Sequence, residues 1–209
     1  RIRLEQADGA TVVLRADLWT TDRAVTIGSD AKPVKLEALR QDPRNPLLPV
    51  TAGVARLGTN EAFRWHGQAP RTVSHAGFWI QQYEVSNAEY LEFVQATGAA
   101  WPSVWPGPWR SNLPATAGKL PVAGVSHEDA KRYAAWRGMR LPTAIEWEVA
   151  ARGRQGWLLP WRADRDLPSI RSNANVNKAV IAQVDDQWPA QYLANVLPVD
   201  SLPSGRSPF

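Results

Sequence analysis

The chain of 209 residues contains no cysteine, which excludes disulfide bonds, thiol catalysis and cysteine-ligated zinc within these residues. It also lacks any run approaching ~18 consecutive apolar residues, the length that a membrane-spanning helix requires. The formal net charge is only +4, and the basic residues are scattered among acids rather than gathered in one block. A role in nucleic-acid binding is therefore not expected.

Histidine is scarce as well. The three histidines, His66, His75 and His127, do not stand at the spacing of metal ligands, and we interpret them as structural or surface residues. Tryptophan and proline are abundant instead, with 11 and 17 residues. This composition predicts that much of the backbone runs in irregular loops, which large aromatic side chains hold in place.

Three segments carry both the start and the stop signal of a helix. Each begins with a hydroxyl residue that can cap the helix, and an acid three residues later completes a capping box. Each ends at a glycine, and at Gly153 we expect a left-handed turn. The predicted helices lie at 86–98, 126–138 and 143–153. In the last of them Glu146 belongs to the capping box, and Glu148 is expected to pair with Arg152 one turn later.

Residues 1–45 predict short strands. Apolar and polar residues alternate from Ile2, Asp8–Gly9 provides a turn, and a β-branched run resumes at Thr11. We therefore expect a small β-rich N-terminal extension over residues 1–45 and a main domain over 46–209. Short strands together with capped helices and long loops predict an α+β fold.

Trp101, Trp105 and Trp109 recur every fourth residue, which is the spacing of a helical stripe. The prolines between them exclude that helix and place the rings on an irregular loop. Two interpretations remain open. The rings anchor the loop to the core, or they form an exposed aromatic surface that binds a partner protein, a peptide or a sugar, with Arg110 as the nearest cation.

Oxygen-bearing side chains gather between residues 173 and 186. Calcium is bound by carboxylate, amide and carbonyl oxygens at this kind of density, whereas the alternative interpretation is a set of solvated turn residues. The candidate residues are Asn173, Asn175, Asn177, Asp185 and Asp186.

The stretch from Met139 to Gly153, MRLPTAIEWEVAARG, closely resembles the signature of the formylglycine-generating-enzyme family, also known as sulfatase-modifying-factor domains. It departs from that signature at Ala144 and Ile145. Other segments resemble the family in the same order along the chain, at 50–58, 69–87, 120–130, 160–161 and 198–209. The resemblance covers about residues 46–209 and stops before the family's C-terminal segment.

This resemblance implies a C-type-lectin-like fold with short twisted strands, two or three helices and many ordered loops. It also implies that Asn175 and Val176, together with Asp185 or Asp186, hold a structural calcium ion. Enzymes of the family oxidise a sulfatase cysteine to formylglycine with a copper-binding pair of cysteines near the C-terminal end. In this chain Ala134 stands where many members have a cysteine.

The family also includes non-catalytic proteins, such as periplasmic accessory and signalling proteins, among them a regulator of type VI secretion kinases. Since the chain has no thiol, no paired histidines and an aromatic loop, we predict a non-catalytic binding or regulatory protein. We expect it to be periplasmic or otherwise exported and to act on a protein partner. The alternative is an oxidoreductase of the same family, represented here by a fragment, for sulfatase cysteine oxidation, sulfoxide synthesis or siderophore maturation.

Overall fold

The computed structural model combines helices with short antiparallel strands, which confirms the predicted α+β fold. It describes residues 2–7, 11–16, 42–59, 69–161, 174 and 195–209. Within these ranges, none of the helices has both the length and the apolar character needed to cross a membrane.

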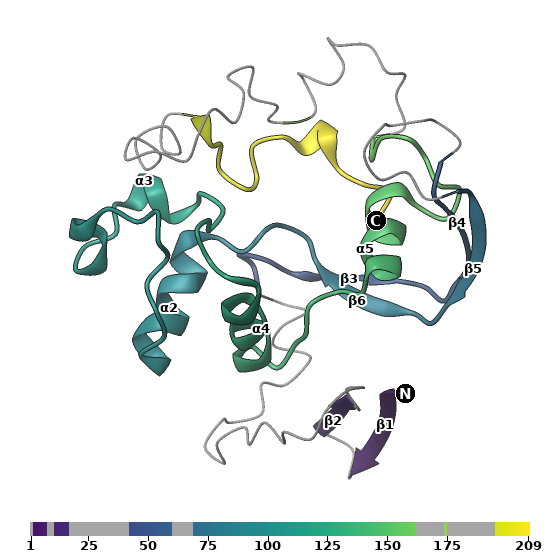
Figure 1. Ribbon diagram of the computed structural model, residues 1–209, viewed down its shortest axis with the longest axis horizontal. Helices are drawn as coiled ribbons and strands as arrows, with labels where there is room; N and C mark the ends of the chain where they lie inside the picture. Colours follow the sequence, from purple (N-terminus) through teal and green to yellow (C-terminus); the bar gives the residue numbers. More distant parts are fainter. Residues whose placement is uncertain (1, 8–10, 17–41, 60–68, 162–173, 175–194) are drawn as a thin grey trace.

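A bent two-stranded ribbon forms the β part of the main domain (Figure 1). Its strands are β3 (Leu47–Val50), β4 (Gly53–Leu57), β5 (Arg71–His75) and β6 (Phe78–Gln81). A single register runs through both antiparallel pairs, because Val50 lies opposite Phe78 and Gly53 lies opposite His75. Gly77 lies at the bend, where a Cβ atom would approach a backbone nitrogen of the facing chain to 3.1 Å. The bend therefore depends on a residue without a side chain.

The N-terminal strands form a separate antiparallel hairpin. Strand β1 (Ile2–Ala7) pairs with β2 (Thr11–Ala16), which confirms that this part of the chain forms short strands. The turn expected at Asp8–Gly9 lies outside the described residues. The division of the chain at residue 45 stays a prediction.

Three helices lie close to the predicted positions, namely α2 (Asn87–Thr97), α4 (His127–Trp136) and α5 (Ala144–Arg152). The predicted capping box is present in each, with Ser86, Ser126 and Thr143 as the caps. Gly98 ends α2 in the left-handed conformation. The left-handed turn expected at Gly153 is wrong in one respect: its φ is 67°, but its ψ of 177° is extended.

Two short helical turns interrupt the segment that was expected to be loop. They are η1 (Gly107–Arg110) and α3 (Ala115–Gly118). Pro108 lies in the first turn of η1 and Pro114 directly precedes α3, positions where the missing N–H of proline removes no hydrogen bond. Proline thus excludes a long helix here but permits these short turns. A third such turn, η2 (Pro203–Gly205), lies near the C-terminal end.

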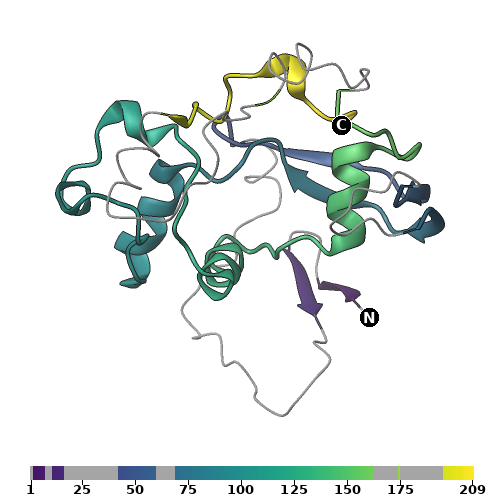
Figure 2. The same ribbon diagram turned by 45° about the horizontal axis from the view of Figure 1, so that its top comes forward.

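The helices divide the hydrophobic core between two ends of the domain (Figures 1 and 2). At one end α5 packs on the ribbon, where Val149 is fully buried in a cluster with Val50 and Leu57, and Phe209 packs against this cluster. At the other end α2 and α4 pack on each other through an aromatic cluster. Its buried members are Tyr90, Phe93, Val94, Ala99 and Tyr133.

An ion pair reinforces the start of α5. The carboxylate of Glu146 accepts hydrogen bonds of 2.7 and 2.6 Å from two guanidinium nitrogens of Arg140, and one of 2.8 Å from the backbone N–H of Thr143. The bonds from Arg140 have the largest effect, and together with those from Thr143 they outweigh partial burial. They lower the pKa of Glu146 to about 2.

We expect Glu146→Gln to lower the free energy of unfolding by about 1 kcal/mol at neutral pH, because it removes the charge and keeps the cap. The native pKa of about 2 lies below the reference value of 4.5. This contribution should therefore be complete above pH 4.5 and disappear as the pH falls toward 2. Urea unfolding across this range measures it, with Glu128→Gln in an exposed pair as the control. A difference that does not change with pH would contradict a role of the Glu146 charge.

Candidate functional site

A buried side-chain amide positions the tryptophan loop. Asn87, the first residue of α2, is 0% exposed. Its Nδ2 donates to the carbonyl oxygen of Ala117 at 3.0 Å, and its Oδ1 accepts a 3.0 Å hydrogen bond from the indole Nε1 of Trp105. Its backbone N–H donates to the carbonyl oxygen of Leu120 at 2.8 Å. One residue therefore connects α2 to the loop, to α3 and to the segment that follows.

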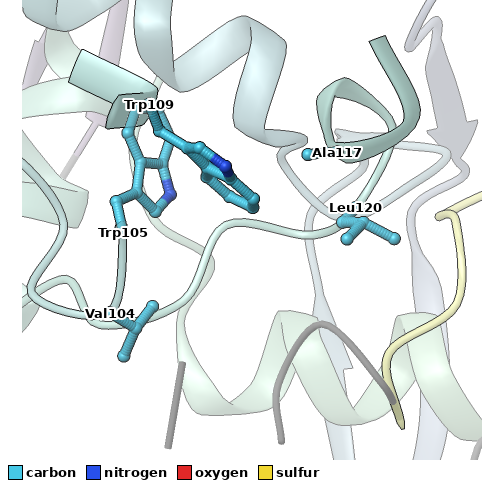
Figure 3. Close-up of a cluster of buried hydrophobic side chains, with 5 residues drawn as sticks. All are labelled: Val104, Trp105, Trp109, Ala117 and Leu120. Carbon is cyan, nitrogen blue, oxygen red and sulfur yellow. The ribbon is translucent and has the colours of Figure 1, made fainter. Parts of the chain in front are cut away.

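Trp105 and Trp109 lie in the core, with only 4% and 6% of their surface exposed. Their ring centroids are 5.9 Å apart in an edge-to-face arrangement. Figure 3 shows the two rings next to each other, with Ala117 and Leu120 in the same cluster. For these two residues the expectation of an exposed aromatic surface is wrong. The indole of Trp105 donates to the buried Asn87 amide, and both rings pack in the hydrophobic cluster. Their burial is what loop anchoring requires.

Trp101 and Arg110 are the two residues of the predicted partner surface that are not fully buried, although Trp101 packs against both core clusters at this end. Trp101 is half-buried, and its ring centroid lies 5.9 Å from that of Trp105. Arg110 is exposed at the end of η1. Binding of a partner at this loop stays a prediction.

The residues predicted to bind calcium, Asn175, Val176, Asp185 and Asp186, lie outside the described part of the chain. Within the ranges that the structure describes, no three acids or histidines are grouped so that they could hold a metal ion. The calcium site therefore stays a prediction.

A network around Arg152 joins the end of α5 to the end of β4. The guanidinium group of Arg152 forms the predicted ion pair with Glu148. It also donates to the carbonyl oxygens of Gly58 and Gly156 at 3.0 Å each and, through Nε, to that of Trp157 at 2.7 Å. Glu148 in turn accepts a 2.7 Å hydrogen bond from the backbone N–H of Gly58. Both residues thus act in the scaffold, and we name this set of contacts the Arg152 joint.

A hollow of about 220 Å³ opens beside the Arg152 joint. Arg56 and Thr59 line it from the end of β4, and Arg152, Gln155 and Gly156 line it from α5 and the turn that follows. Gly156 has a φ of 65°, and a Cβ atom there would lie 2.5 Å from the carbonyl oxygen of Arg56. Only glycine lets the turn approach the strand this closely. No motif in the sequence marks this hollow, because segments far apart in the chain form it.

Comparison with known proteins finds one matching family model and several similar proteins. A family model described as the Sulfatase-modifying factor enzyme 1-like domain matches residues 35–205. The chain is 33% identical over 171 residues to the formylglycine-generating enzyme of Mus musculus, a match that covers 62% of the chain and 46% of the enzyme. It is 34% identical over 147 residues to the formylglycine-generating enzyme of Thermomonospora curvata, which covers 51% of the chain and 48% of the enzyme.

A third relative carries a different name. The chain is 33% identical over 160 residues to a Mus musculus protein named inactive C-alpha-formylglycine-generating enzyme 2, a match that covers 58% of the chain and 51% of that protein. The chain therefore spans about half the length of the curated relatives it matches.

We expect Trp105→Ala to lower the free energy of unfolding by about 3–5 kcal/mol, since it empties a buried position and removes one hydrogen-bond partner of Asn87. Trp147→Ala is the matched control, because the same side chain is lost from a position that is 62% exposed. It should cost less than about 1 kcal/mol. Urea unfolding of the two variants and the parent measures both values. Equal costs at the two positions would contradict the assignment of Trp105 to the core.

Proposed function

Because the chain belongs to the family of the Sulfatase-modifying factor enzyme 1-like domain, we propose that it is a non-catalytic binding or regulatory protein built on that scaffold. The observation that carries this proposal is a family scaffold in the described part of a chain whose 209 residues contain no thiol. Ala134, where many family members have a cysteine, is buried in the core. The 33% identity to a relative named inactive also supports a non-catalytic role.

The loop that carries Trp101 and Arg110 is the surface we propose for a protein partner. The buried rings of Trp105 and Trp109 fix its backbone, so that little conformational entropy remains to be lost on binding. Trp101 is half-buried and Arg110 is exposed, and tryptophan and arginine are residue types that often dominate the binding energy of interfaces. In this proposal the protein is exported, for example to the periplasm, and serves an accessory or signalling role such as the regulation of type VI secretion.

A second candidate function is oxidation of a sulfatase cysteine by a longer form of this protein. Two relatives at 33% and 34% identity are named formylglycine-generating enzyme, and the chain spans about half of their length. This observation favours an enzyme whose reacting residues lie in the other half.

Turnover of a cysteine-containing sulfatase peptide, with copper supplied, distinguishes the two functions. The measurement uses the complete translation product of the gene, after its intact mass has been determined. We expect no aldehyde product above the peptide-only background, while the formylglycine-generating enzyme of Thermomonospora curvata, run in parallel, converts the peptide. Robust turnover by the complete product would overturn the non-catalytic proposal.

We also propose that Asn175, Val176, Asp185 and Asp186 hold a structural calcium ion. An ion that binds the native state alone stabilises it, by about 2.7 kcal/mol when it is present at a hundredfold excess over its dissociation constant. The melting temperature should therefore fall on chelation and recover when calcium, but not magnesium, is added. The double variant Asp185→Asn, Asp186→Asn should no longer respond. A melting curve of the parent that chelator leaves unchanged would rule out the site.

A further inference from the structure

The hollow beside the Arg152 joint presents hydrogen-bond donors whose partners are missing. Arg56 is one of the lining residues, and in the described part of the chain its exposed side chain forms no hydrogen bond or ion pair. Gln155 accepts a 3.4 Å hydrogen bond from Trp157 through its side-chain oxygen, while its amide nitrogen donates to no described group. Two side chains of the lining can therefore still donate.

Two backbone acceptors of the hollow are already occupied. The carbonyl oxygens of Gly58 and Gly156 both accept from Arg152, and so each has a strong donor. Glu148, the nearest acid in the Arg152 joint, is neutralised by Arg152 and is not among the described residues of the lining. Of the two described charged residues that line the hollow, Arg152 is paired with Glu148 and Arg56 is not, so the positive charge of Arg56 remains.

From this imbalance we infer that the hollow binds a small oxyanion, either a carboxylate or a phosphate group. The fork of guanidinium N–H groups in arginine matches two oxygens of such an anion, and a charge-assisted bond of this kind is about twice as strong as a neutral one. The volume of about 220 Å³ accommodates a small anion together with water, since one water occupies about 30 Å³ in the liquid. This site is independent of the proposed partner loop.

Backbone contacts fix the two sides of the hollow to each other. The backbone N–H of Arg56 donates to the carbonyl oxygen of Arg154 at 2.9 Å, so the strand is fixed to the turn after α5 without help from the Arg56 side chain. Gly156 allows the close approach of that turn. The Arg56 side chain is thus free to bind a ligand, and its replacement leaves the backbone contacts intact.

Titration of the 209-residue chain with inorganic phosphate, at constant ionic strength set by potassium chloride, tests this site. Binding is followed by the NMR signals of the arginine side chains and by the melting temperature. We expect saturable binding that Arg56→Gln weakens by about tenfold or more, since it removes the charged donor. Gln155→Ala should weaken binding by a smaller factor. The matched control Arg132→Gln, on the exposed face of α4, should leave it unchanged.

Acetate in place of phosphate identifies the form of the oxyanion. Tighter binding of acetate assigns the site to carboxylates, and tighter binding of phosphate assigns it to phosphate groups; both support the proposal. A response that does not saturate, or one that Arg132→Gln reduces as much as Arg56→Gln does, would mean an adventitious ion only and would overturn it. If Arg56→Gln lowers the stability of the fold, the affinity of Gln155→Ala for the anion decides instead, because Gln155 also lines the hollow.

Discussion

A side-chain amide that leaves water must find both a donor and an acceptor inside the protein, and Asn87 finds them in segments with little regular structure of their own. The indole of Trp105 supplies the donor and the carbonyl of Ala117 supplies the acceptor. In the low dielectric of the core these bonds are strong, and losing either leaves a costly unpaired group. The loop around Trp105 and Trp109 is therefore held by this polar contact together with the packing of its rings.

At the ribbon end of the domain, charged arginine side chains rather than an amide bind the backbone carbonyl oxygens. Arg152 holds the end of β4 through the carbonyl oxygen of Gly58, while Arg154 donates to the carbonyl oxygens of Thr51 at 3.0 Å and Ala52 at 2.9 Å, at the bend between β3 and β4. Arg152 at the end of α5 and Arg154 two residues later thus fix this end of the helix to both ends of β4. Guanidinium groups suit this task because several of their N–H groups can reach different backbone carbonyls at once.

Much of the fold was predictable from the sequence wherever the determining contacts are local. The caps at Ser86 and Thr143 act over three residues, so the helices begin where the sequence predicts. The burial of the Trp105 ring was not predictable, because its hydrogen-bond partner lies eighteen residues away on α2. The hollow at Arg56 was missed for the same reason, since its other side is formed by the turn that follows α5. The sequence contains these residues, but only the tertiary fold brings them together.

The Arg152 joint also bears on how the chain folds. Gly58 and Arg152 are 94 residues apart, so their contact closes almost half of the chain into one loop. The strands of the ribbon pair across much shorter connections, and α5 carries its own cap. Since the entropy cost of closing a long loop precedes any gain from the contact, we expect the ribbon and the capped helix to form before the joint does. The joint then adds hydrogen bonds and an ion pair to the hydrophobic contact of Val149, so that α5 and the ribbon stabilise each other only once both have formed.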